Sequence, residues 1–155
     1  RERAAPLQRS RFALAGLTEE IAEMEFRDGA EGFFIDNRIA PSLIAAADRD
    51  QLFRVLHNLA QNAAQAGAHR LSFRAAESEA LLVIEVADDG PGLPPKAREN
   101  LFRPFAGSAR PGGTGLGLAI AREVMRAHGG DIALDESTGA GTIFRLSLPR
   151  ASAPV

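Results

Sequence analysis

The chain has 155 residues, of which 45% are hydrophobic and 25% charged, and its formal net charge at pH 7 is −2. This length suits one soluble globular domain, and the near-neutral charge excludes a global basic field that would recruit nucleic acid. The lack of cysteine excludes disulfides, thiolate zinc sites and a cysteine nucleophile. Because the sequence starts without a methionine, we expect a fragment of a longer protein.

The first part of the sequence predicts a helix, two short strands and a second, stronger helix. Residues 1–10 are polar and without periodicity, so we interpret them as a linker or stub from an upstream domain. Helical spacing of apolar residues predicts a helix over 12–26, which glycines then end. Two short strands are expected at 32–35 and 43–47, around a turn. From 48 to 66, apolar residues recur at steps of three and four, which predicts the clearest helix of the chain.

The second part predicts two strand pairs, with a loop-rich stretch and a helix between them. Because such hairpins alternate with helices, we expect an α/β (α+β) two-layer sandwich, a mixed sheet of about five to six strands with three helices on one face. The elements predicted in this part are strands at 71–75 and 81–87, one helical turn near 95–101, a helix at 116–128, and strands at 131–136 and 142–148.

Two asparagines on the strongest predicted helix are candidates for cation binding. On a helical wheel the apolar residues fill one arc, and Asn62 falls at the edge of that arc. Asn58 lies one turn earlier on the same side. Asn62 alone would suit a boundary residue that hydrogen-bonds a neighbouring loop, whereas two stacked amides can also supply carbonyl oxygens to a hard cation. A capping residue for this helix is expected at Asp48 or Asp50.

The glycines are concentrated, since seven of the 15 lie between positions 90 and 117. The first group follows a predicted strand as Asp88-Asp89-Gly90-Pro91-Gly92. These dipeptides fit a tight turn, while a buried Asp88 would also suit an acceptor for an exocyclic amine, with the glycines letting the backbone approach a ring. Metal ligation by both acids ranks lower, because adjacent side chains of an extended chain point apart.

A second glycine group, residues 112–118, leads directly into a predicted helix. The start of a helix offers free amides and the positive end of its dipole, which suits phosphate. A Rossmann motif would need a strand immediately before this segment, and a Walker A loop needs Gly-Lys-Ser/Thr, so neither fits. A third group, Gly139-Ala140-Gly141-Thr142, suits a hairpin turn from which the Thr142 hydroxyl can reach a ligand.

The order of these motifs resembles that of the catalytic ATP-binding domain of bacterial sensor histidine kinases. This family belongs to the superfamily shared with DNA gyrase, heat-shock chaperones and mismatch-repair ATPases. The similarity lies in an N box at 57–63, a G1 box at 88–92, an F box at 101–105, a G2 box at 113–120 and a last glycine box at 139–142. It implies a Bergerat-type, mostly antiparallel fold over 11–149, with an ATP lid at 103–114 and a C-terminal tail at 150–155.

The resemblance implies that the domain binds ATP and Mg²⁺. Asn62 would be the main Mg²⁺ ligand with Asn58 supporting it, and these two would be the catalytic residues. Asp88 would accept a hydrogen bond from the adenine amino group, and Gly92 would line the ring. The other residues implied in nucleotide binding, by backbone, lid or phosphate contacts, are Gln65, Gly90, Phe102, Phe105, Arg110, Gly113, Thr114, Gly115, Leu116, Gly117, Leu118 and Thr142.

Two residues depart from the family pattern. Asn58 stands where superfamily ATPases place a glutamate that activates water, and an amide is not a general base at neutral pH. Gln65 replaces a lysine or arginine that helps many family members to hold phosphate. The sequence therefore predicts poor ATP hydrolysis and a domain that positions the γ-phosphate for an external nucleophile.

The expected nucleophile is a histidine outside this chain. His57, His69 and His128 lack the phosphoacceptor pattern, so we interpret all three as structural, with His128 at a helix end that favours a cation. The implied partners are an upstream dimerisation/phosphoacceptor domain and, through it, a response regulator, without nucleic acid. We expect a monomeric domain of a homodimeric parent, in the cytoplasm whether or not the parent is anchored in the inner membrane.

Two other functions stay open at this point. A nucleotide-sensing regulatory module would bind ATP without phosphotransfer, and the presence of every glycine motif weighs against such degeneracy. An anti-sigma-factor-type serine kinase of the same superfamily would be expected to keep the glutamate that Asn58 replaces.

Overall fold

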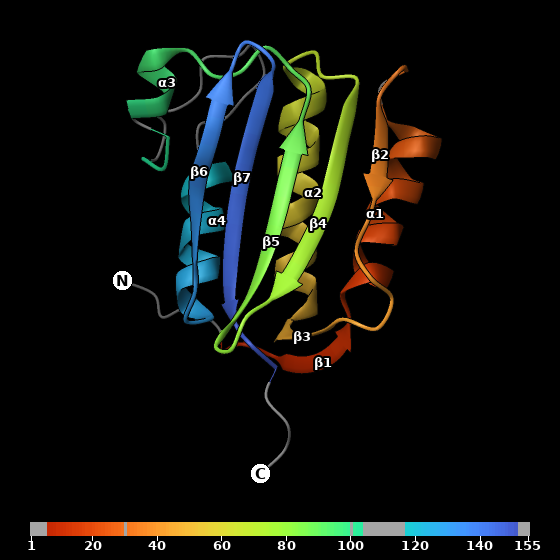
Figure 1. Cartoon of the computed structure of the whole chain (residues 1–155), viewed down its shortest axis with the longest axis vertical. Coiled ribbons are helices and arrows are strands. Elements are labelled where there is room, and N and C mark those ends of the chain that lie inside the picture. Colours follow the sequence, from red (N-terminus) through yellow and green to blue (C-terminus); the bar gives the residue numbers. More distant parts are fainter. Residues whose placement is uncertain (1–5, 30, 100, 104–116, 152–155) are drawn as a thin grey trace.

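The computed structural model of the chain describes residues 6–29, 31–99, 101–103 and 117–151. These residues form strands and helices in two sheets with helices packed on them (Figure 1). The elements are β1 (Arg9–Ala13), α1 (Leu14–Asp28), β2 (Phe34–Asn37), β3 (Ile44–Asp48), α2 (Arg49–Gln65), β4 (Arg70–Glu77), β5 (Leu81–Asp88), α3 (Pro95–Glu99), α4 (Gly117–Ala127), β6 (Asp131–Thr138) and β7 (Gly141–Pro149).

The main sheet has five strands in the order β2-β4-β5-β7-β6. Strand β2 runs parallel to β4, and the other neighbouring strands are antiparallel. Helices α1, α2 and α4 lie behind this sheet on one face, and the short α3 stands apart at one end (Figure 1). The predicted mixed two-layer sandwich, with three helices on one face, is therefore confirmed.

The core lies between the sheet and these helices. The apolar arc predicted for α2 is buried, and the strands and α4 supply the facing side chains. Burying a leucine-sized side chain stabilises a fold by about 1.5–3 kcal/mol, so this layer is the main source of stability. Its largest fully buried members on these elements are Leu52, Leu56, Leu71, Phe73, Leu82, Ile84, Met125, Ile132 and Leu146.

The N-terminal part differs from the prediction. Arg9 and Ser10, expected in the linker, begin β1, and the helix expected from residue 12 begins only at Leu14. Strand β1 pairs antiparallel with β3, with Arg9 opposite Asp48. Most of β1 is exposed, so no apolar alternation marks it, and only its pairing with a distant segment defines it.

The two short strands predicted next also differ in their pairing. They form at β2 and β3, shifted by one or two residues, but they lie in different sheets. Strand β2 joins the edge of the main sheet beside β4, whereas β3 pairs with β1. The segment between them therefore connects two sheets and is not a hairpin turn.

The N-terminal segment contacts the ends of two helices at one corner of the molecule. The backbone N–H of Gln8 donates to Asp48 Oδ2 at 3.0 Å, and Asp48 Oδ1 accepts the N–H of Gln51 at 3.2 Å. Asp48 thus caps α2, as one of the two predicted candidates. Arg9 Nη2 donates to the carbonyl of Ala127, the last residue of α4, at 3.5 Å.

His128 completes this corner from the end of α4. Its side chain is 2% exposed, and its Nε2 accepts the backbone N–H of Asp48 at 2.9 Å. Its Nδ1 lies 2.8 Å from the carbonyl of Val124 and donates to it. Both ring nitrogens of His128 are therefore bonded to backbone groups. These two bonds and the burial agree with the structural role predicted for His128.

Replacing Asp48 with asparagine should destabilise the domain in a pH-dependent way. The amide of Gln8 lowers the pKa of Asp48 most; burial opposes this, and the net pKa lies below the ordinary 3.8. A lowered folded-state pKa adds stability above the unfolded-state value, and this contribution is lost as the pH falls through the folded-state pKa. Asp48→Asn leaves one acceptor oxygen for two amides, so we expect a loss of about 1 kcal/mol at pH 7.

Urea unfolding at pH 7 and below about pH 3 measures this effect, since the difference from the wild type should shrink in acid. Asp50→Asn is the matched control, because Asp50 is exposed in the first turn of α2. Equal unfolding midpoints for the two variants at pH 7 would show that Asp48 contributes no cap.

Candidate functional site

Asp88 is the last residue of β5, at the end of the sheet where β7 begins. Its neighbours across the sheet are Leu71 on β4 and Thr142 on β7. The side chain is half-buried, and its Oδ1 accepts the N–H of Gly90 at 2.8 Å. A carboxylate held in this way is a fixed acceptor at the rim of the core.

Asp89 points away from this position, as expected for adjacent residues of an extended chain. Its Oδ1 accepts the backbone N–H groups of His69 at 2.8 Å and Arg70 at 2.9 Å. Burial raises the pKa of Asp89, but these amide bonds outweigh it and hold the pKa below its ordinary value. Asp89 therefore secures the start of β4, and the two acids do not form one metal site.

Glycine is required where the turn between β6 and β7 packs against Asp88. Gly141 has φ +144°, and a Cβ at this residue would lie 2.0 Å from the Asp88 carbonyl oxygen. Gly92 has φ +83°, in the region that favours glycine. A Cβ at Gly90 would lie 3.0 Å from Asp88 Oδ1. Gly90 thus lies against the Asp88 carboxylate and Gly141 against its backbone carbonyl, while Gly92 is set apart by its positive φ alone.

The predicted cation ligands lie on α2. Asn58 and Asn62 are half-buried one turn apart, beside the buried Leu59 and Ala63. Amide oxygens are ligands that hard cations accept, so these residues suit Mg²⁺. Gln65 is exposed in the last turn of the same helix. Four segments lie toward the same end of the molecule (Figure 1). They are the later half of α2, the end of β5, the beginning of β7 and the beginning of α4.

The remaining described candidates flank this end. Gly117 begins α4, and Leu118 follows it, partly buried against the core. Phe102 also packs against the core, with the guanidinium of Arg122 4.7 Å from its ring centre. Arg122 in turn pairs with Asp131 at 3.4 Å. The candidates Phe105, Arg110, Gly113, Thr114, Gly115 and Leu116, with nearly all of the predicted lid, lie outside the described residues.

One residue at this end was not predicted. Ser137 lies opposite Thr142 in the β6–β7 pair, and the two hydroxyl oxygens are 3.2 Å apart. Ser137 Oγ also accepts the backbone N–H of Leu93 at 2.8 Å. Thr142 itself is 4% exposed. The hairpin around Gly139-Ala140-Gly141 was a signal that Ser137 faces Thr142, but the contact with Leu93 depends on the fold.

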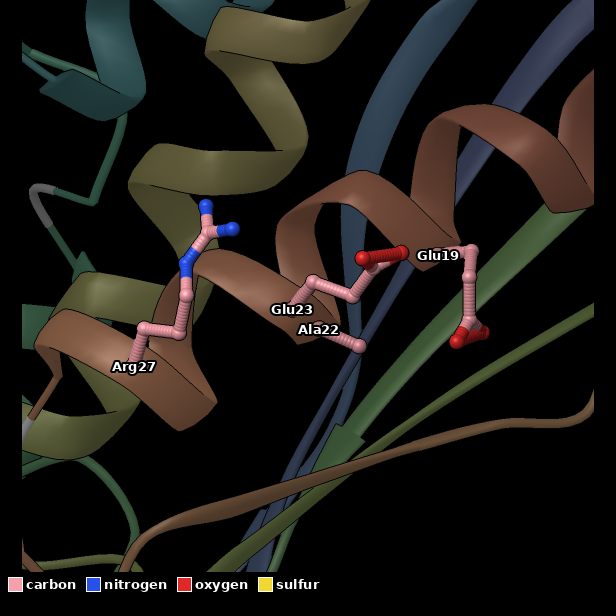
Figure 2. Close-up of a pocket in the computed structure, with 4 residues that line it drawn as sticks. All are labelled: Glu19, Ala22, Glu23 and Arg27. Atoms are coloured by element: carbon pink, nitrogen blue, oxygen red, sulfur yellow. The ribbon is translucent and has the colours of Figure 1, made fainter.

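A surface hollow of about 350 Å³ lies elsewhere, on α1. Its described lining residues, Glu19, Ala22, Glu23 and Arg27, all come from that one helix (Figure 2). None of them is among the predicted site residues. We therefore assign the candidate site by the side chains around Asp88 and α2 and not by this hollow.

The chain matches the family model described as histidine kinase-, DNA gyrase B- and HSP90-like ATPase over residues 47–152. It is 42% identical over 125 residues to the sensor histidine kinase WalK of Bacillus subtilis, covering 75% of this chain and 20% of WalK. It is 37% identical over 131 residues to the sensory histidine kinase/phosphatase NtrB of Rhodobacter capsulatus, covering 75% of this chain and 36% of NtrB. The chain thus spans a minor part of these relatives.

Solved structures agree with these relatives. Full-length ShkA in complex with AMPPNP superimposes with a TM-score of 0.83 and 30% identity, over 99% of this chain and 33% of that one. The catalytic domain of the histidine kinase ThkA gives 0.78 and 28%, over 93% and 99% of the two chains. In the described part of the chain, no helix is both long and apolar enough to cross a membrane. The chain belongs to the histidine kinase-, DNA gyrase B- and HSP90-like ATPase family and has the fold of histidine kinase catalytic domains.

Proposed function

We propose that this chain binds ATP with Mg²⁺ and presents the γ-phosphate to a histidine of a separate dimerisation/phosphoacceptor domain. The observation that carries the proposal is the environment of Asp88. Its carboxylate accepts the N–H of Gly90 at the strand end, Gly141 packs against its backbone carbonyl, and the buried Thr142 lies opposite it on β7. Such an acceptor suits the exocyclic amine of adenine, and the neighbouring glycines leave room for the ring.

The other end of the nucleotide would lie along α2 and the start of α4. Asn62, supported by Asn58, would hold Mg²⁺, which supplies charge neutralisation on the phosphates when bound. The first backbone amides of α4, from Gly117 onward, would add positive dipole at the phosphates. Gln65, exposed in the last turn of α2, supplies an amide where many relatives carry a cation, so this helix contributes no charge there.

Two of the three described histidines have side-chain contacts that suit a nucleophile outside this chain. His128 is buried with both ring nitrogens bonded, and the ring of His57 stacks on Phe53 with centres 5.8 Å apart. In the proposed reaction a histidine nitrogen of the other domain attacks the γ-phosphorus. The bond to the bridging oxygen breaks, and ADP leaves. Asn58 offers no base for water, so transfer is favoured over hydrolysis.

The partners follow from the same proposal. The relatives are sensor histidine kinases, so we propose an upstream dimerisation/phosphoacceptor domain and, beyond it, a response regulator. A monomeric catalytic domain within a homodimeric parent, located in the cytoplasm, fits this role. The net charge of −2 gives no support for a nucleic-acid partner.

Phosphotransfer in trans tests the proposal. The isolated chain with γ-labelled ATP and Mg²⁺ should not label itself, and it should label an added phosphoacceptor domain of the parent. The label should be acid-labile, as expected for phosphohistidine. Stable label on this chain alone would contradict an external nucleophile. Binding of ATP without any transfer to the added domain would instead favour the nucleotide-sensing module.

A further inference from the structure

The loop that carries Gly92 is held at both ends by side-chain oxygens. At its start the N–H of Gly90 donates to Asp88 Oδ1 at 2.8 Å. At its end the N–H of Leu93 donates to Ser137 Oγ at 2.8 Å. The residues after Leu93 are Pro94 and Pro95, which have no backbone N–H to donate. The amide of Leu93 is therefore the last backbone donor by which this loop is fixed before α3.

Ser137 has a second contact that reaches the candidate site. Its hydroxyl oxygen lies 3.2 Å from Thr142 Oγ1. A serine hydroxyl has one proton and two acceptor lone pairs, so Ser137 can accept from Leu93 and still bond Thr142. Because Thr142 is nearly fully buried beside Asp88, this contact limits the directions in which its hydroxyl can point.

We propose that Ser137 is a positioning residue for the adenine end of the nucleotide site, holding the Gly92 loop and orienting the Thr142 hydroxyl. This inference rests on the proposed function, because it takes Asp88, Gly92 and Thr142 as adenine contacts. Ser137 does not touch the nucleotide itself. It fixes in advance the parts that do, which lowers the ordering cost of binding.

The experiment compares Ser137→Ala, Ser137→Cys and Ser137→Thr with the wild type. Alanine removes the hydroxyl, cysteine keeps nearly the same shape with a much weaker hydrogen-bonding group, and threonine keeps the hydroxyl. Ser147→Ala is the matched control, because Ser147 lies on the same strand pair and its hydroxyl donates to the Asp131 carbonyl at 3.5 Å, at the other end of that pair. The dissociation constants of Mg-ATP and Mg-ADP are measured by calorimetry, and amide exchange of Leu93 by nuclear magnetic resonance.

The alanine and cysteine variants should bind ATP and ADP each about five-fold more weakly, the effect of one neutral hydrogen bond. Their ATP-to-ADP affinity ratio should match the wild type, since the change lies away from the γ-phosphate. The Leu93 amide should lose protection in both. Threonine should restore affinity and protection, and Ser147→Ala should change neither.

Two results would overturn the inference in different ways. If the wild type binds ATP and Ser137→Ala binds equally well while folded, Ser137 has a structural role only. If the wild type itself binds neither nucleotide, the proposed function fails and this inference fails with it. If alanine prevents folding, the comparison of cysteine with threonine still decides, because both keep an atom at the γ position and only threonine keeps the hydroxyl.

Discussion

Gly141→Ala should destabilise the domain by more than about 3 kcal/mol, because strain and a backbone clash coincide there. The φ of +144° disfavours any side chain, and the new Cβ would meet the Asp88 carbonyl oxygen at 2.0 Å. To relieve this clash, the β6–β7 hairpin must move away from β5. That movement would shift Asp88 and Thr142 relative to each other, so nucleotide affinity of the folded fraction should fall as well. Thermal and urea unfolding measure the first effect, and calorimetry the second.

Two other glycines separate these effects. Gly139 lies in the same hairpin, and a Cβ there meets nothing within 4 Å, so Gly139→Ala should leave both stability and binding unchanged. A Cβ at Gly130 would lie 1.7 Å from the Ser147 carbonyl oxygen, at the opposite end of the β6–β7 pair. Gly130→Ala should therefore destabilise the domain without weakening nucleotide binding in the folded fraction. A Gly141→Ala variant as stable as Gly139→Ala would contradict the clash.

Asp88→Asn should abolish most of the stabilisation that Mg-ATP gives to the wild type. A hydrogen bond to a charged group contributes roughly 1.5–3 kcal/mol, so affinity should fall by at least about tenfold. The fold should persist, because the asparagine oxygen can still accept the N–H of Gly90. A thermal-shift series in ATP measures the change, since bound ligand raises the melting temperature in proportion to the logarithm of its excess over Kd.

Asp89→Asn is the charge-matched neighbour for this test. Its side chain bonds the amides of His69 and Arg70 and points away from Asp88, so nucleotide affinity should stay at the wild-type value. An equal loss of affinity in both variants would indicate a general electrostatic effect of removing one negative charge, and it would remove Asp88 from its proposed role.

The fold was predictable where buried apolar residues recur at the spacing of a helix or a strand. The apolar arc of α2 is continuous over several turns, and strands β4, β5 and β7 alternate buried with less buried residues. These patterns predict which face of each element packs in the core, and so the two layers. Strand β1 is mostly exposed, and its only definition is the pairing with β3, far away in sequence. No local pattern could have shown it.

The site was predictable where its contacts join residues that are close together in the sequence. The opposite directions of Asp88 and Asp89 follow from extended backbone, and the glycines around them follow from the turn. Ser137 was missed because its partner Leu93 lies 44 residues away. The contact of the His128 ring was missed for the same reason, since its partner amide belongs to Asp48, 80 residues earlier.

At the corner formed by Gln8 and Arg9, the N-terminal segment contacts two helices that pack on the main sheet. The backbone of Gln8 bonds the carboxylate that caps α2, and the side chain of Arg9 bonds the end of α4. Both helices are thus contacted by the same short segment, and each carries a proposed nucleotide contact at its other end. The corner therefore joins the start of the first strand to the two helices that carry the proposed nucleotide contacts Asn62 and Gly117.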